Sequence, residues 1–360
     1  MRAFALRGRT HACNVGVMAE PASEELVAFL RSLGATTGQI ENAQRENSLN
    51  QLPTDLIFAA DARLSAAELA SLLGVEVSLI VAMWRTLGIA VPDEDHAMFS
   101  ERDVRFTTLA LEFRPVGHYA EELFRVLGSS LTRVAEAAVS LYVQTIEPEM
   151  DSPHVDVVAS LKDLVETTSL AVQLGDSMGA IFAHHLHDAI DRQRSAQDGV
   201  SERSLFRLTV GFVDLVGFTP ISLHATPSAL LSLIGGFEAR AFEVAASHNG
   251  RIVKHIGDEV MFVALDVSAG CAIARDLTRA YSDGVEPRGG VAFGEVITRH
   301  GDYYGPVVNL ASRLADLAIP REVLVDAVTA SAGSGSFAFR PAGHRLLKGF
   351  DEPVEVFSLA

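Results

Sequence analysis

Apolar and polar residues follow two different patterns, one before and one after about residue 200. From residue 20 to about 192, apolar residues recur at helical spacing. Helix start signals precede some of them, such as Ser23 and the capping box that opens at Ser65. This pattern predicts an all-α region with helices over 24–33, 66–73, 77–87, 104–128, 129–147 and 154–193.

After residue 205 short apolar strands alternate with helices. The pattern predicts strands over 206–213, 251–256, 259–265, 289–297, 322–326 and 353–358, and helices over 220–248, 267–281 and 306–318. Residues 331–336 are small and polar, which predicts a flexible loop. A polar stretch at about 192–204 separates the two patterns and is the predicted linker. We therefore expect an α+β protein with one domain over residues 1–200 and another over 201–360.

Composition supports two folded domains. The chain has 360 residues, and its hydrophobic content of 48% excludes a disordered protein. No apolar run approaches the ~18 residues of a membrane span, and we find no signal peptide near the N-terminus. The cysteines, Cys13 and Cys271, are far apart and fit a reducing compartment. We expect a cytoplasmic protein without a disulfide framework.

The net charge of −17 argues against a nucleic-acid-binding surface. Most of that charge lies in residues 1–200, which carry 15 Lys and Arg against 28 Asp and Glu. Lysine is rare, with three residues against 26 arginines. Lys254 and Lys348 both lie beside motifs of the second domain, which is the placement expected where a compact point charge is needed.

The first of these motifs ends an apolar strand at Asp214. Gly217 then allows a turn, and Thr219 with Pro220 predicts a helix start whose free amides could bind a triphosphate. By itself, Asp214 could equally be a helix-capping acid.

A second acid, Asp258, follows Gly257 at a predicted hairpin tip 44 residues later. Aspartate in a turn is usually structural, but an acid at a tight tip can also meet the acid that ends a neighbouring strand. Two carboxylates that meet in this way can hold divalent metal ions for attack on a nucleotide phosphate. Lys254 lies on the strand that leads into the hairpin.

The third cluster is the run from Gly301 to Arg313. Pro306 can start a helix, which places Asn309 and Arg313 one turn apart on the same face. An amide and a guanidinium in this arrangement can bind a ribose and an anionic phosphate, although a solvated helix face would look the same.

Taken together and in this order, the motifs of residues 205–360 closely resemble the catalytic domain of class III nucleotidyl cyclases. The shared features are the first aspartate motif, the Lys-x-Ile-Gly-Asp-Glu hairpin at 254–259, the Asp-x-x-Gly-x-x-Val-Asn-x-Ala-Ser-Arg run at 302–313, and a late Leu-Lys-Gly at 347–349. The resemblance implies a ferredoxin-like βαββαβ fold. It implies two Mg²⁺ or Mn²⁺ ions per active site, bound by Asp214, Asp258 and the carbonyl of Leu215.

The resemblance also implies how the nucleotide is bound. It assigns the base to Lys254 and Asp302, the triphosphate to Gly217, Phe218, Thr219 and Lys348, and the transition state to Asn309 and Arg313. Each site of this family lies between two catalytic domains, so a homodimer would form two equivalent sites.

The chemistry of the base favours ATP, because lysine donates to adenine N1 and aspartate accepts from its amino group. We expect an adenylate cyclase that forms 3′,5′-cyclic AMP and pyrophosphate. Guanylate or diguanylate cyclase activity and a non-catalytic nucleotide-binding module are the alternatives. His255, where many members have threonine, should face away from the site because neighbouring strand residues alternate.

Residues 1–200 resemble the helical regulatory domain of autoinhibited mycobacterial cyclases, in architecture more than in motifs. Residues 65–104 resemble a helix-turn-helix of the MerR kind, but the acidic charge argues against DNA. Six histidines leave open either proton sensing or ordinary surface positions: His96, His118, His154, His184, His185 and His187. A small apolar ligand between the helices is a further possibility.

Overall fold

The structure is a computed structural model that describes residues 23–59, 62–145, 156–196, 205–279 and 285–360. Its internal contacts divide the chain into two units, Met1–Ala180 and Ile181–Ala360. Most of the predicted linker, residues 197–204, lies outside the described residues. The boundary near residue 200 therefore stays a prediction.

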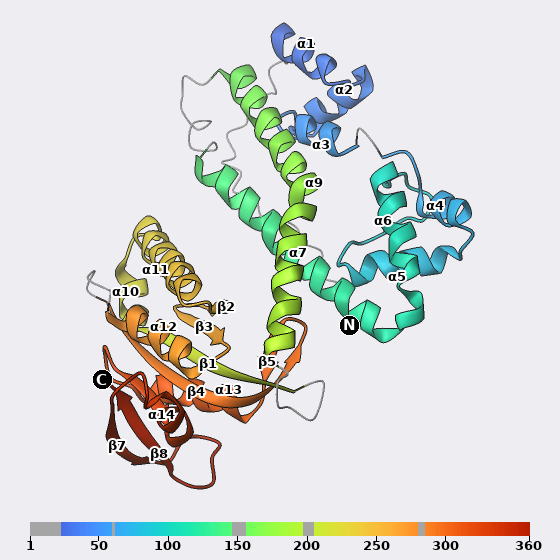
Figure 1. Ribbon diagram of the computed structural model, residues 1–360. Coiled ribbons are helices and arrows are strands. Elements are labelled where there is room, and N and C mark those ends of the chain that lie inside the picture. The colour runs from blue at the N-terminus through green and yellow to red at the C-terminus, as the bar shows by residue number, and fades with distance from the viewer. Residues whose placement is uncertain (1–22, 60–61, 146–155, 197–204, 280–284) are drawn as a thin grey trace. The chain divides into compact units, whose positions relative to one another are not determined.

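Unit 1 is helical, as predicted (Figure 1). Its elements are α1 Glu24–Ser32, α2 Thr37–Arg45, α3 Leu52–Ala59, α4 Ala66–Leu73, α5 Val77–Thr86, α6 Glu101–Glu112, the 3-10 turn η1 Arg114–Val116, α7 His118–Thr145 and the start of α9 Val157–Ala196. Ser23 caps α1, and Ser65 forms the expected capping box with Glu68. One core joins α1–α3 to the start of α9 around Leu30 and Leu161, and another surrounds Trp84.

The predicted helix break at residues 128–129 is wrong. Helix α6 ends at Glu112, and α7 runs without interruption through Gly128. The break lies at Pro115 and Gly117, whose φ of 65° is unfavourable for other residues. Gly128 is instead a packing glycine, because a Cβ built there would lie 2.2 Å from the carbonyl oxygen of Leu87.

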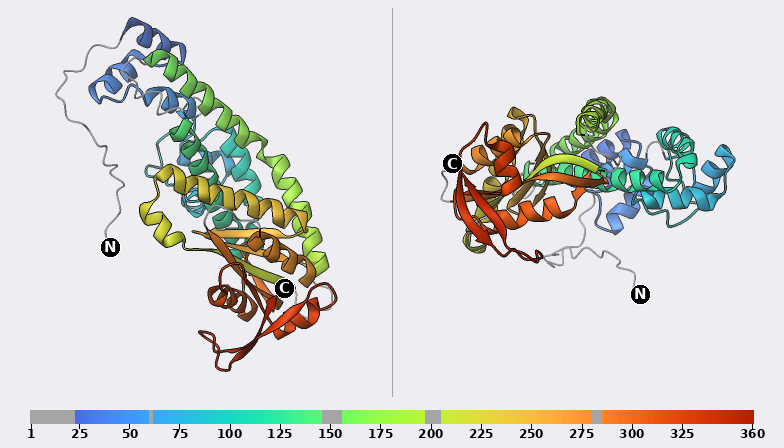
Figure 2. Two further views of the ribbon diagram at one scale, coloured as in Figure 1. Left: turned by 90° about the vertical axis from the view of Figure 1, so that its left-hand side faces the viewer. Right: turned by 60° about the horizontal axis from the view of Figure 1, so that its bottom comes forward.

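Unit 2 contains an eight-stranded sheet in the order β2-β3-β1-β4-β6-β8-β7, with β5 paired to β4 (Figures 1 and 2). The strands are β1 Leu205–Val216, β2 Arg251–Ile256, β3 Glu259–Ala264, β4 Glu286–Arg299, β5 Asp302–Tyr304, β6 Val323–Asp326, β7 Phe339–Arg345 and β8 Val354–Leu359. The first four are antiparallel neighbours in the order β2-β3-β1-β4. With α11 and α12 this is the βαββαβ arrangement, so the predicted fold class is confirmed.

The helices of unit 2 are α10 Phe218–His224, α11 Pro227–Ser247, α12 Val267–Arg279, α13 Pro306–Leu317 and α14 Ala327–Gly333. Sequence patterns missed β5, β7 and α14 and merged α10 with α11. The expected flexible loop at 331–336 is wrong in its first half, which belongs to α14 because Asp326 caps that helix by accepting from Val328 and Thr329. Helix α10 begins at Phe218 after Gly217, so Thr219 is not its N-cap.

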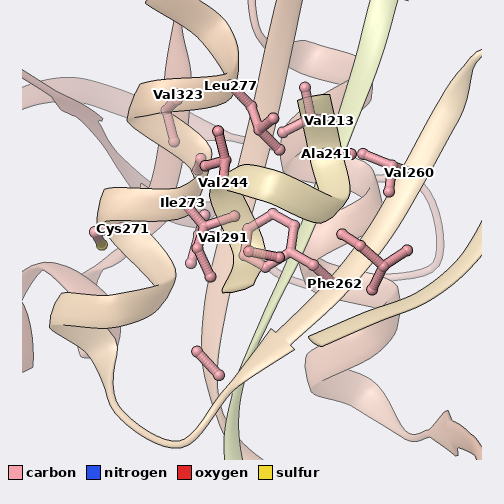
Figure 3. Packing of buried hydrophobic residues seen from close by; sticks show 14 of the residues in the cluster. Val213, Ala241, Val244, Val260, Phe262, Cys271, Ile273, Leu277, Val291 and Val323 are labelled. Atoms are coloured by element: carbon pink, nitrogen blue, oxygen red, sulfur yellow. The ribbon is translucent and has the colours of Figure 1, made fainter. Parts of the chain in front are cut away.

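Opposite faces of the sheet pack against different helices. Phe262, Val213 and Val291 pack with Ile273 and Val244 of α12 and α11 (Figure 3). The other face, which includes Phe212 and Met261, packs against α13. At Gly290 a Cβ would lie 2.2 Å from the backbone nitrogen of Ala315 and 2.3 Å from the carbonyl oxygen of Ala311. Helix α13 therefore lies directly on β4.

Among the residues that the structure describes, no single helix is long and apolar enough to span a membrane. The bent pair α4 and α5 reaches that length and composition only when both helices are taken together.

Candidate active site

A row of charged residues crosses three strands at the end of β1. Asp214 pairs in register with Glu259 of β3 on one side and with Arg288 of β4 on the other. Side chains alternate along a strand, so Asp214 shares the α13 face with Phe212 two residues before it. The register thus places a half-buried carboxylate at the edge of the apolar contact with α13.

Asp258 lies beside Asp214, as the hairpin motif predicts. Gly257, with φ 66°, forms the turn between β2 and β3. Burial has the largest effect on the pKa of Asp258 and raises it. The charge of Asp214 and a hydrogen bond with the Asp214 side chain raise it further. Asp214 therefore destabilises the charged form of Asp258, and a bound divalent cation would be favourable beside the two side chains.

Glu259 is a third acid at this position, which the sequence motif contains but to which we assigned no role. Its pKa is raised to about 7, mainly by burial and then by the charges of Asp214, Asp316 and Asp258. The charge of Arg288 lowers the same pKa and offsets part of this rise. Repulsion from three acids shows that this edge of the sheet concentrates negative charge. In the described part of the chain, no group of three or more His, Cys, Asp or Glu could hold a metal ion.

Arg288 is a site residue that sequence reasoning missed. Its Nε and Nη2 both donate to Oδ2 of Asp214, at 3.1 and 3.0 Å. Its Nη1 donates to the carbonyl oxygens of Asp316 at 2.7 Å and Ala318 at 3.3 Å, at the end of α13. A lone arginine in a strand carries no motif, and only the pairing of β4 with β1 could have identified it.

Lys254 and Asp302 form an ion pair between β2 and β5, although 48 residues separate them. The second carboxylate oxygen of Asp302 accepts from the backbone N–H of Tyr303 at 2.9 Å. Arg251 donates to the Tyr303 hydroxyl at 3.1 Å and lies over the Tyr303 ring. The two residues assigned to the base are thus adjacent and are supported by a neighbouring contact.

His255 faces the other side of β2, as expected. Its ring lies 5.6 Å from that of Phe242, and its Nδ1 is 4.0 Å from a Glu238 oxygen, both on α11.

Asn309 and Arg313 lie one turn apart on α13, which starts at Pro306 after Gly305. Asn309 is exposed. Arg313 donates to the Asp316 carboxylate at 2.8 Å within the same helix. The carboxylate and the carbonyl oxygen of Asp316 thus accept from Arg313 and Arg288 respectively.

The remaining predicted site residues lie at the ends of strands and in turns. Leu215 is buried near the end of β1, Gly217 and Phe218 form the start of α10 with Thr219, and Lys348 is exposed in the turn between β7 and β8. Their assigned roles, like those of all the site residues, stay predictions.

The six histidines considered in residues 1–200 are exposed wherever the structure describes them. His184, His185 and His187 lie on α9, and Nδ1 of His187 is 3.4 Å from a carboxylate oxygen of Asp191. His154 lies outside the described residues.

Two family models match the chain. One is described as an adenylate cyclase regulatory domain and matches residues 16–190. The other is described as an adenylate and guanylate cyclase catalytic domain and matches residues 200–360.

Several proteins are similar to this chain over most of its length. An uncharacterized protein of Mycobacterium tuberculosis is 31% identical over 343 residues, which cover 93% of this chain and 89% of that protein. An adenylate cyclase of Glutamicibacter nicotianae is 32% identical over 284 residues, covering 73% of this chain and 70% of that protein. The pH-sensitive adenylate cyclase MT1302 of Mycobacterium tuberculosis is 27% identical over 359 residues, covering 96% and 89%.

Proposed function

Because the chain belongs to the adenylate cyclase family, with a regulatory domain before the cyclase catalytic domain, we propose that it converts ATP to 3′,5′-cyclic AMP and pyrophosphate. The observation that carries the choice of ATP is the Lys254–Asp302 ion pair. An ammonium donor beside a carboxylate acceptor complements N1 and the amino group of adenine. Guanine presents the opposite pattern at that edge.

Asp214, Asp258 and the carbonyl of Leu215 would hold two Mg²⁺ or Mn²⁺ ions. Bound ions lower the pKa of the 3′-hydroxyl and neutralise the triphosphate. Gly217, Phe218, Thr219 and Lys348 orient the triphosphate so that the 3′-oxygen faces the α-phosphorus and pyrophosphate leaves on the opposite side. The proximity of Asp214 to Asp258, whose pKa it raises, supports this role.

Asn309 and Arg313 donate to the ribose and the α-phosphate as negative charge develops there. In the homodimer that we propose, they act on the nucleotide held by the aspartates of the other chain.

The regulatory domain would set the active fraction, and pH is the stimulus we favour because the relative MT1302 is named pH-sensitive. A cavity of about 290 Å³ near Met83, Ala120 and Phe124 could hold the small apolar ligand that we consider as a second effector. We further propose that the enzyme works in the cytoplasm.

Activity assays of the full chain with ATP and with GTP test which nucleotide is the substrate. Cyclic AMP should form much faster than cyclic GMP, as measured by chromatography of the products. The double variant Lys254→Glu with Asp302→Cys should lose most of this preference, because a site built for hydrogen bonds leaves its groups unpaired against the wrong base. Arg340→Gln, at the opposite edge of the sheet, is the control. Unchanged preference in the double variant would remove both residues from base recognition.

A further inference from the structure

The strand that carries Lys254 contains a bulge. Arg251 lies opposite Val263 of β3, and three residues later Lys254 lies opposite Met261. Three steps along β2 thus match two along β3, and Val253 is the extra residue. Without the bulge, Arg251 and Lys254 would face opposite sides of the sheet. With it, both share the α13 face, on which Met261 and Val263 are buried. The bulge therefore places a second cation on the side of the lysine that we assign to the base.

The acid of the base-reading pair lies on a short hairpin. Asp302 is the first residue of β5, a strand of three residues that pairs with the end of β4. The turn before it contains His300 and Gly301, both at positive φ. A strand of this length makes few ladder hydrogen bonds, and such hairpins are marginally stable unless they pack against other elements. Contacts from outside the hairpin are therefore expected to fix the position of Asp302.

Arg251 supplies contacts of this kind on both sides of Asp302. Its Nη2 donates to the carbonyl oxygen of Gly301 at 3.4 Å and to the hydroxyl of Tyr303 at 3.1 Å. Its guanidinium carbon lies 5.5 Å from the centre of the Tyr303 ring. The backbone N–H of Tyr303 donates to Oδ1 of Asp302 at 2.9 Å, and Oδ2 of Asp302 pairs with Lys254. Arg251 thus holds the two neighbours of the carboxylate that faces Lys254.

The shape of the guanidinium matters more in this contact than its charge. Both oxygens that accept from Nη2 are neutral. The Nε of Arg251 is buried without a hydrogen-bond partner among the described residues, which is unfavourable. A planar guanidinium can stack on a ring and donate in a fixed direction, whereas an ammonium is a point charge on a flexible stem. The side chain is therefore explained by the position that it imposes on the hairpin.

We propose that Arg251 and Tyr303 are positioning residues for base selection, which hold the β4–β5 hairpin so that Asp302 stays in line with Lys254. Both act through Asp302. If the hairpin could shift, the acceptor would no longer face the amino group of adenine, and a site with displaced hydrogen-bonding groups discriminates poorly between bases. The inference rests on the proposed function, because it requires Lys254 and Asp302 to read the base.

Nucleotides that cannot cyclise test the proposal without turnover. The full chain is titrated by calorimetry with 3′-deoxy-ATP and 3′-deoxy-GTP in the presence of Mg²⁺, and the ratio of the two dissociation constants measures base preference. Arg251→Met should reduce this preference at least about 10-fold, mainly by weakening 3′-deoxy-ATP binding. Tyr303→Phe removes only the hydroxyl and should reduce it about 2- to 10-fold. Arg251→Lys should recover only part of the loss. In turnover by Arg251→Met, the KM for ATP should rise more than kcat falls.

Two controls separate positioning from general damage. Arg207→Gln removes a guanidinium that lies over the Phe293 ring on the opposite face of the sheet, and should match the wild type. A chain that merely folds less well has fewer binding sites, but the ratio of its dissociation constants is unchanged. The double variant Arg251→Met with Asp302→Asn should show the same ratio as Asp302→Asn alone, because Arg251 acts through Asp302.

The opposite results would overturn the proposal. An unchanged ratio in Arg251→Met would remove Arg251 from base selection, and full recovery in Arg251→Lys would mean that charge alone suffices. A further loss when Arg251→Met is added to Asp302→Asn would mean that Arg251 acts by another route. If Arg251→Met does not fold, Tyr303→Phe decides by the same criteria.

Asp302→Asn separates the positioning role from the proposed function. If its ratio equals that of the wild type, Asp302 does not read the base and both proposals are wrong. A loss of preference in Asp302→Asn without any loss in Arg251→Met and Tyr303→Phe refutes only the positioning role.

Discussion

The central strands of unit 2 and the long helices α7 and α9 differ in how completely one chain buries their apolar side chains. Strands β1 and β3 are buried along most of their length between α11, α12 and α13. The two helices expose many large apolar residues: Tyr119, Leu123, Leu131, Val134, Val139 and Leu141 on α7, and Leu170, Leu174, Ile181, Phe182, Leu186 and Ile190 on α9.

This difference separates two tasks. The contacts that position Asp214 and Lys254 on the sheet lie within one chain, so the geometry of these candidate site residues does not depend on a partner. Exposed apolar surfaces of that extent are typical of protein–protein or ligand-binding interfaces. In the proposed homodimer, the second chain would cover them. Regulation is then expected where packing within one chain is incomplete.

The largest expected effect is on the sheet. Asp214→Ala or Asp258→Ala should lower cyclic AMP formation at least about 1,000-fold, because metal neutralisation of the phosphates contributes several kcal/mol. Circular dichroism should show an unchanged fold. Asp351→Asn, an exposed acid between β7 and β8, should retain activity. Activity within tenfold of wild type in either aspartate variant would disprove the metal assignment.

Mixing two inactive chains tests whether the sheet supplies only half a site. Asp214→Ala and Asn309→Ala should each be inactive alone. After subunit exchange, about half of the dimers would be mixed with one intact site each, which restores about a quarter of wild-type activity. A mixture that stays inactive although exchange is verified by mass-tagged chains would argue against sites shared between chains.

The helices should control the response to pH. Replacing His184, His185 and His187 by Gln should flatten the activity profile between about pH 5.5 and 8, because protonation adds charge to an acidic region. A bias of about 3 kcal/mol would change the active fraction by roughly 100-fold. His344→Gln on β7 is the control. Parallel profiles for the triple variant and the wild type would exclude these histidines as the sensor.

A single methyl group should have different effects at two positions on the long helices, Gly128 of α7 and Gly175 of α9. Gly128→Ala places a Cβ against the Leu87 backbone and should destabilise unit 1 by about 1 to 3 kcal/mol. Gly175→Ala on α9 meets no atom within 4 Å and should be neutral or slightly stabilising. Differential scanning calorimetry of both variants measures the effect. Equal melting curves would contradict the close packing at Gly128.

The smallest effect concerns Glu259. The pKa of Glu259 in the folded chain is about 7, above the ordinary value of 4.5. Its contribution to the free energy of unfolding is therefore complete below about pH 4.5 and is lost as pH rises through 7. The metal-free chain should lose about 1 to 2 kcal/mol over this range, after allowance for solvent screening. Urea denaturation in EDTA across pH measures it. Glu259→Gln should reduce this loss, whereas exposed Glu295→Gln should keep it in full. The raised pKa of Asp258 contributes a loss of the same sign, so only an undiminished loss in Glu259→Gln would assign it to another group.

Local signals predicted the parts of the fold that depend on neighbours in sequence. The alternation around Asp214 and the Gly257 turn were sufficient to expect both aspartates at one sheet edge. The role of Arg288 was not predictable, because it depends on the register of β4 against β1 and on where α13 ends. Likewise Gly117 and Gly128 look alike in sequence, but Gly117 adopts a φ of 65° between two helices, whereas Gly128 lies inside α7 against the backbone of Leu87.

The close approach of α13 to β4 at Gly290 has a mechanical consequence. At Gly290 no strand side chain separates α13 from β4, which restricts sliding of the helix, and Arg288 joins the end of α13 to Asp214. Asp214 and the helix that carries Asn309 and Arg313 are therefore expected to move as one rigid unit. Deforming such a rigid unit would cost more free energy than moving it as a whole. In the proposed dimer, the regulatory domain would therefore act by rotating one catalytic domain against the other, which would open or close both sites in the same movement.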